Sequence, residues 1–274
     1  MTDRRALLES RDGGVLTLTL NRPDRRNALN SEVWAAFGAA LTTAADDPGV
    51  RALVLTGAGG AFCAGLDLNG AGPGGHPLDV SGAGPGGHPL DEMRRAGELA
   101  LRLHDLPIPV VAKVTGVAVG AGWNLALGCD LVVATPESRF SQIFVHRGVS
   151  VDFGGSWLLP KLVGLQQAKR LVLLGEMIDA AEAHRLGLVT WVVPAAEIDA
   201  FVSDLGRRLA AGPPIATAQS KALLNEGADR TLRDALAGEA RAQSVNFATA
   251  DSREGITAFL DRRDPVFTGE WAVK

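Results

Sequence analysis

The sequence predicts an α/β fold, and two observations support that prediction. Short apolar stretches rich in β-branched residues alternate with segments whose apolar residues recur every three or four positions, as strands and helices do when they alternate along one chain. From about residue 195 to 262 only the helical spacing continues. We therefore expect an α/β core over residues 1–195 and a helical C-terminal region over 196–274.

The expected elements follow one another with clear turn signals. Residues 15–20 alternate as VLTLTL and stop at Asn-Arg-Pro, which predicts a strand and a turn. Residues 31–45 place Trp34, Phe37 and Leu41 on one helical face, with Asn30 or Ser31 as the N-cap. Further strands are expected at 51–56, 109–114, 131–134 and 188–193, and Pro213-Pro214 should separate two C-terminal helices.

Composition excludes several classes of protein. The 274 residues carry 27 basic and 31 acidic side chains, a net charge of −4, so we expect neither a nucleic-acid partner nor an anionic membrane surface. Two cysteines make no disulfide framework, and with only 5 histidines no zinc or other metal site is expected. Neither an apolar leader nor a membrane span is visible, which predicts a cytoplasmic protein.

An exact duplication stands out at residues 69–91. The decapeptide GAGPGGHPLD occupies 70–79 and again 82–91. Eight glycines and four prolines in these 22 residues cannot form a core, so we expect a flexible surface loop. The repeated His76 and His88 are better explained by duplication within a tolerant loop than by metal binding, while a role as an active-site lid stays open.

Two segments suggest an anion-stabilising site. Residues 61–68 read AFCAGLDL, and residues 109–130 run from a strand through Gly120, Ala121 and Gly122 into a helix. Small residues at such a junction let a ligand approach backbone N–H groups at the positive end of a helix. A tight strand–helix contact that needs glycine for packing explains the pattern equally well. The glycine-rich 57–62 lacks the third glycine of a dinucleotide-binding loop.

The order of motifs resembles the crotonase superfamily, the enoyl-CoA hydratase/isomerase family, over almost the whole chain. The matching pieces are Asn-Arg-Pro at 21–23 with NALN at 27–30, AFCAGLDL, the 109–130 segment, Phe-Ser-Gln at 140–142, residues 155–164, AAEA at 180–183 with Gly-Leu-Val at 187–189, and Glu-Gly at 254–255 with Ala-Phe at 258–259. The resemblance implies a spiral of repeated ββα units and a C-terminal region that forms a homotrimer or a dimer of trimers. It also implies an acyl-CoA substrate with no separate cofactor.

Carried over residue by residue, the resemblance assigns an oxyanion hole to the backbone N–H groups of Leu66 and Ala121. It places coenzyme A against residues 22–28 and 62–68, with Ala64, Asp67 and Gly120 at the binding site. Among basic residues, Arg25, Arg26 and Arg262 are candidates for the CoA phosphates, although solvated surface arginines are the simpler interpretation. Asp67 is expected to order the loop beside the oxyanion hole.

The catalytic positions depart from the hydratase pattern. The two glutamates that the resembling hydratases use would fall at Asn124 and Phe144, and neither is a carboxylate. Asp152, within GVSVDFGG, matches the position where several isomerases of the family carry an acid/base aspartate. Its apolar neighbours would raise its pKa by desolvation. The alternative role for Asp152 is the N-cap of the following helix.

Three functions therefore remain open. The favoured one is double-bond isomerisation of an unsaturated acyl-CoA, with Asp152 as acid/base and Leu66 and Ala121 as the oxyanion hole. Hydration, with Asp152 replacing both glutamates and Asn124 positioning water, is the second, and a non-catalytic acyl-CoA-binding protein is the third. Nucleophilic attack by Asp152 on an aryl-CoA ranks below these, because no matching histidine is visible. A role for His146 as a proton shuttle is less favoured. We expect Trp123, Cys63 and Cys129 to be packed side chains without a chemical role.

Overall fold

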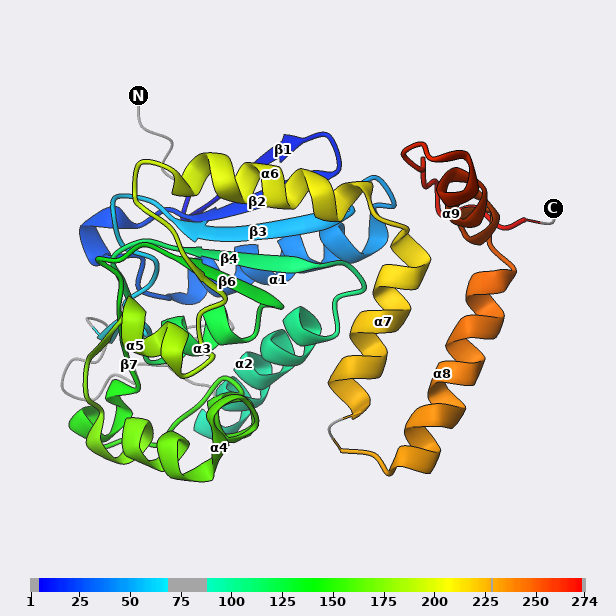
Figure 1. Ribbon diagram of the computed structural model, residues 1–274. Coiled ribbons are helices and arrows are strands. Elements are labelled where there is room, and N and C mark those ends of the chain that lie inside the picture. Colours follow the sequence, from blue (N-terminus) through cyan, green and yellow to red (C-terminus); the bar gives the residue numbers. More distant parts are fainter. Residues whose placement is uncertain (1–4, 69–87, 228, 273–274) are drawn as a thin grey trace.

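The computed structural model describes residues 5–68, 88–227 and 229–272. Strands and helices alternate through the first two thirds of this part, and helices alone follow (Figure 1). The α/β class expected from the sequence is confirmed.

A large sheet has the strand order β1-β2-β3-β4-β6-β9 within the described residues. Its strands are β1 (Leu7–Asp12), β2 (Val15–Leu20), β3 (Ala52–Gly57), β4 (Val110–Val114), β6 (Leu131–Ala134) and β9 (Trp191–Val192). Only the β1–β2 pair is antiparallel. Parallel strands are usually covered on both faces, and here β3 is almost wholly buried.

A smaller sheet runs in the order β5-β7-β8, with β5 (Val117–Val119), β7 (Arg139–Ser141) and β8 (Ile178–Asp179). It arises because the chain repeats one unit: β4, β5 and α3 (Ala121–Leu127) are followed by β6, β7 and α4 (Gly155–Leu174). In each unit the first strand joins the large sheet and the second joins the small one in parallel. This repetition is the spiral of ββα units that the family resemblance implied.

Helices cover both faces of the large sheet (Figure 1). On one face, α1 (Ser31–Asp46), α2 (Pro89–His104) and α3 enclose the main core, in which Phe37, Trp123 and Phe140 are fully buried or nearly so. On the other face, α6 (Ile198–Ala211) packs its Val202 and Leu205 on the sheet. The boundary expected at residue 195 thus precedes a helix that shares the core.

The helices that extend away from the sheet begin with α7 (Pro214–Gly227) and continue as α8 (Leu232–Phe247) and α9 (Ala250–Asp261) (Figure 1). Lys221 fastens α7 to the core through an ion pair with Asp130 (2.8 Å). Residues 263–272 lie back on α9, where the Asp251 carboxylate accepts the N–H groups of Thr268 and Gly269. Within the described part of the chain, no helix is long and apolar enough to cross a membrane.

Several sequence expectations are refined by the structure. Asn30 is the N-cap of α1 and accepts the Val33 N–H. Most of the duplicated interval lies outside the described residues, but its end is helical, since His88 caps α2 and Pro89 to Asp91 form its first turn. The late strand shrinks to two residues because the Leu188 N–H closes a turn to the Ala183 carbonyl. The short α5 (Ala180–Arg185) and the 3-10 turns η1 (Pro23–Arg25) and η3 (Ile143–Arg147) complete the description.

Candidate active site

Two loops that are far apart in sequence interlock at the carboxyl ends of β2 and β3. The Ala64 N–H donates to the Arg26 carbonyl, and the Leu29 N–H donates to the Gly65 carbonyl. Fully buried Asn27, with φ +57°, donates its side-chain amide to the carbonyls of Ala58 and Ala61. The segments that the sequence assigned to coenzyme A, 22–28 and 62–68, are therefore brought together.

The 62–68 segment also lies directly against the start of α3. Cys63 pairs with Ala118, and the Val119 N–H donates to the Cys63 carbonyl (2.9 Å). Gly65 has φ +85°, and a Cβ added there would lie 2.8 Å from the Val119 oxygen and 3.7 Å from the Ala121 nitrogen. Gly122 has no room for a Cβ either, because the carbonyl and thiol of Cys63 occupy that space. The close approach explains why glycine stands at both positions.

This approach places two backbone amides beside each other. Ala121 is the first residue of α3, and the Leu66 amide belongs to the peptide that follows Gly65. Among the described residues, neither N–H donates a hydrogen bond to another group. Two neighbouring amide donors, one at a helix N-terminus, are the kind of groups that can stabilise a developing oxyanion.

Asp152 stands in a strained turn just ahead of α4. Phe153 follows it with φ +46°, an unusual value for a bulky residue, and its buried ring contacts Trp34 at 5.3 Å between centroids. Asp152 Oδ1 is buried without a hydrogen-bond partner in the described structure. Burial raises the pKa of the carboxyl from 3.8 to about 6. The N-cap of α4 is Gly154, so the capping alternative for Asp152 is wrong.

Asn124 joins the Asp152 turn to the helix of the oxyanion hole. One turn after Ala121, its fully buried amide donates to the Asp152 carbonyl oxygen (2.8 Å), and its oxygen accepts from Gln142 Nε2 (2.8 Å). Gly155 must lack a side chain, because a Cβ there would collide with the Asn124 amide. Asn124 thus holds the backbone of the Asp152 turn.

Phe144 forms an apolar wall near the same junction. The ring is buried, and a Cβ added at Gly120 would meet its Cζ at 3.7 Å. Gly120 itself has φ +56° and donates its N–H to the Ser141 carbonyl. A phenyl ring at this position excludes water from the surroundings of Ala121 and offers no proton acceptor.

The charged candidates divide into one fixed pair and several exposed side chains. Asp67 forms an ion pair with Arg22 (2.7 Å), in which both side chains are mostly buried, and Arg22 also donates to the Ala28 carbonyl. Asp67 therefore holds the two interlocked loops together. Arg25 and Arg26 are exposed on the same loop, open to solution, whereas Arg262 caps the end of α9.

The remaining candidate residues show no sign of a chemical role at this site. His146 is exposed and lies against Gly175. Trp123 is fully buried and packs on Phe140 at 5.4 Å between centroids. Burial raises the pKa of the Cys63 thiol to about 12, so it stays protonated. No cluster of metal-ligating side chains occurs in the residues that the structure describes.

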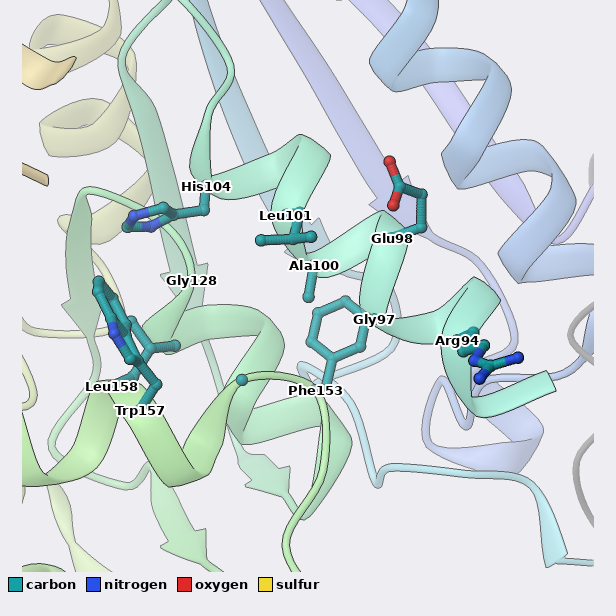
Figure 2. Close-up of a pocket in the computed structure, with 11 residues that line it drawn as sticks. Arg94, Gly97, Glu98, Ala100, Leu101, His104, Gly128, Phe153, Trp157 and Leu158 are labelled. Atoms are coloured by element: carbon teal, nitrogen blue, oxygen red, sulfur yellow. The ribbon is translucent and has the colours of Figure 1, made fainter. Parts of the chain in front are cut away.

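Sequence reasoning placed Gln142 and Gly155 in matching segments, and Phe153 and Trp157 beside Asp152, but it foresaw neither the contacts that fix Asn124 nor the nearby cavity. Gln142 and Gly155 fix Asn124, and a cavity of about 660 Å³ between α2 and α4 is lined by Gly97, His104, Phe153 and Trp157, among others (Figure 2). The Gly154-Gly155 pair before an apolar helix was the available signal for Gly155. Gln142 and the cavity residues follow from tertiary contacts that carry no local pattern.

The comparison with family models is in keeping with this geometry. A model described as enoyl-CoA hydratase/isomerase matches residues 10–270. The 1,2-epoxyphenylacetyl-CoA isomerase of Escherichia coli (strain K12) is 39% identical over 264 residues, which are 96% of this chain and 98% of the relative. The crotonyl-CoA hydratase of Syntrophomonas wolfei is 35% identical over 255 residues, 92% of this chain and 94% of the relative.

Solved structures share the fold. An enoyl-CoA hydratase from Polaromonas sp. JS666 superposes with a TM-score of 0.86 at 35% identity, covering 96% of this chain and 99% of the other. Relatives of comparable similarity thus carry the names of isomerases and of hydratases, so the reaction itself has to be argued from the side chains.

Proposed function

Because the chain belongs to the enoyl-CoA hydratase/isomerase family, we propose that it moves the double bond of an unsaturated acyl-CoA, with Asp152 as the single acid/base. The supporting observation is the Asp152 carboxyl itself. Its Oδ1 atom is buried and has no hydrogen-bond partner within the described structure, and Asn124 ties the Asp152 backbone to the helix that starts at Ala121. The neighbouring amides of Leu66 and Ala121 supply the oxyanion hole.

In the proposed reaction the thioester oxygen of a 3-enoyl-CoA accepts hydrogen bonds from the Leu66 and Ala121 amides. The Asp152 carboxylate takes a proton from the α-carbon, and the electron pair moves into a dienolate whose negative charge lies largely on that oxygen. The protonated Asp152 then gives the proton to the γ-carbon, and the double bond ends between the α- and β-carbons. One such backbone donor contributes roughly 3–4 kcal/mol to transition-state stabilisation.

The pKa of Asp152 suits both halves of this reaction. A carboxyl with a pKa of about 6 is ionised at neutral pH, so it can accept the proton from the α-carbon. Because this pKa lies close to neutral pH, the protonated carboxyl can also return the proton to the γ-carbon. General acid/base help works best when the pKa lies near the operating pH. An ordinary aspartate near 4 would be a weaker base.

Hydration is less well supported by the side chains. Asn124, at the first glutamate position of hydratases, has its amide engaged by Asp152 and Gln142, and Phe144 at the second cannot activate water. An acyl-CoA-binding protein without turnover would leave the unpartnered Asp152 carboxyl unexplained, because burying it carries a cost in stability.

We also propose that the protein acts in the cytoplasm, without a separate cofactor, as a homotrimer or a dimer of trimers. Apolar side chains on the C-terminal helices support an assembly. Leu224, Phe247 and Phe259, one on each of α7, α8 and α9, leave 79%, 69% and 82% of their surfaces exposed in a single chain, and an assembly would bury them.

The experiment compares wild type with Asp152→Asn in turnover of a 3-enoyl-CoA to its conjugated 2-enoyl isomer, with hydration of a 2-enoyl-CoA measured in parallel. We expect isomerisation that falls at least about a hundredfold in the variant, and little hydration. Hydration without isomerisation would overturn the proposal in favour of a hydratase. Tight acyl-CoA binding without either reaction would favour the binding protein.

A further inference from the structure

The cavity between α2 and α4 adjoins the Asp152 turn. Phe153 and Gly154, the two residues after Asp152, belong to its wall, and Gly128, which caps the end of α3, lies on another side (Figure 2). The helix whose first amide serves the proposed oxyanion hole therefore ends at this cavity. A volume of about 660 Å³ falls within the range of small-molecule sites, roughly 300–1,000 Å³.

The aromatic part of the wall is held in place. The His104 ring meets Trp157 edge-on at 5.2 Å between centroids. The Lys161 ammonium lies 4.3 Å from the centre of the same indole and forms an ion pair with Asp229. Trp157, 39% exposed, is thus fixed by neighbours on two elements and stands as a rigid apolar surface.

The two charged side chains of the cavity wall, Arg94 and Glu98, lie on one side of it. Figure 2 shows Arg94 and Glu98 on the side of α2 away from the His104–Trp157 pair, while the Phe153 ring lies beside Gly97 and Ala100. On the His104–Trp157 side of the cavity a ligand consequently meets mainly aliphatic and aromatic carbon. A polar or charged end on the ligand would lose its hydration without compensation.

We propose that this cavity binds the part of the acyl group beyond the fourth carbon, so that the substrates are CoA thioesters of apolar acyl groups longer than four carbons. The inference rests on the proposed isomerisation, in which the α- to γ-carbons lie at Asp152. A four-carbon acyl group ends at the γ-carbon and leaves the cavity unfilled. A longer chain or a ring continues past Phe153 toward Trp157 and buries apolar surface there.

Binding of saturated, unreactive thioesters tests the proposal without turnover. Dissociation constants of butanoyl-, octanoyl- and phenylacetyl-CoA are measured by calorimetry, the last two having eight acyl carbons each as a chain and a ring. Each fully buried methylene contributes about fourfold in affinity. We expect at least one of the eight-carbon esters to bind tenfold or more tightly than butanoyl-CoA, and the tighter one identifies a chain or a ring as the ligand.

Two variants change the cavity in opposite ways. A side chain at Gly97 would grow into open space in the cavity, since a Cβ there meets no atom within 4 Å. Gly97→Leu, a favourable change in a helix, should abolish the preference and leave butanoyl-CoA binding within twofold. Trp157→Ala should reduce the preference at least fivefold. Leu162→Ala, exposed on α4 and outside the cavity wall, is the matched control.

Failure of this inference is distinct from failure of the proposed function. Equal affinity for the three esters, or a preference that survives Gly97→Leu, would overturn the cavity assignment while short 3-enoyl-CoA isomerisation continued. Selective binding that Gly97→Leu removes, in a protein that turns over no 3-enoyl-CoA, would retain the cavity assignment and overturn the isomerase.

Discussion

Around the Asp152 turn, Asn124 and Gln142 are completely buried and hydrogen-bonded to each other, whereas at the cavity Leu101 and Trp157 leave 56% and 39% of their surfaces exposed. The first region fixes backbone positions through glycine contacts and buried amides. The second is a wall of side chains with few polar partners. If the proposed function holds, the interlocked backbone sets the positions of the reacting groups, and the side chains of the cavity set the choice of acyl group.

Among substitutions in the two interlocked loops, we expect Gly65→Ala to cause the largest loss of activity. Gly65→Ala places a Cβ against the Val119 carbonyl at a backbone angle of φ +85°, so the Leu66 and Ala121 amides must move apart. Loss of one oxyanion donor costs about 10²–10³-fold in kcat, and we expect a decrease of that size in isomerisation.

Gly60→Ala serves as the control for Gly65→Ala. It has a similar angle, φ +79°, but its Cβ would meet nothing within 4 Å. Its backbone strain is therefore comparable without the collision. An equal loss of kcat in both variants would show that strain, and not displacement of the amides, explains the effect.

A smaller effect is expected at Asn124. Asn124→Ala removes the hydrogen bonds to the Asp152 carbonyl and to Gln142, so the turn that carries the Asp152 carboxyl can shift although the carboxyl itself is unchanged. We expect kcat to fall about 10–100-fold with little change in KM, because misplacement of a catalytic group by about 1 Å can cost 10²-fold. The pH midpoint of activity should shift as well, since the surroundings of the carboxyl change. A change in KM alone would contradict a positioning role.

Burial of the Asp152 charge should be visible as a stability cost. Between pH 3.8 and about 6 the folded protein keeps a proton that the unfolded chain releases, so stability is lost as pH rises through this window. Asp152→Asn removes that cost, and we expect it to be more stable than wild type at pH 8 by roughly 1–3 kcal/mol. Urea unfolding at pH 8 and near pH 4 measures the difference, which should nearly vanish at the lower pH.

Substitutions in the cavity wall should have the smallest effect on the free energy of unfolding. Leu101→Ala, at a half-exposed position of α2, is expected to alter the free energy of unfolding by no more than about 0.5 kcal/mol. On the same helix, Leu103 is fully buried, and Leu103→Ala should cost about 2–5 kcal/mol. Thermal or urea unfolding of both variants would sharpen the contrast, and equal losses would contradict it.

How far the sequence alone predicted this molecule depends on the kind of signal. Strands β2, β3, β4 and β6 of the large sheet, the Asn30 cap and the helical C-terminal region follow from local patterns, because one face or both faces of each strand and helix are apolar. The first strand, LLESRD, was missed because an exposed edge strand carries little alternation. Helix α2 was missed because it begins inside the duplicated segment, whose glycines and prolines predict a loop.

The site divides in the same way. The small residues at Gly120, Gly122 and in the 62–68 segment predict a close approach of the backbone. The structure brings these segments together. The role of Asn124 could not be predicted, since it depends on Gln142 and on Gly155, residues 18 and 31 positions away in the chain. Seen in sequence, Asn124 is a missing glutamate; in the structure it holds the turn of the remaining carboxylate.

The central claim, that one carboxylate carries the proton, is tested most directly by the pH dependence of kcat/KM for isomerisation in wild type and Asp152→Asn. We predict that the wild-type value rises through a single ionisation near pH 6 and then levels off. In the variant the rate should be at least about a hundredfold lower at pH 8 and should lack this ionisation. A wild-type profile that is flat through pH 6, or the same ionisation in Asp152→Asn, would contradict the account.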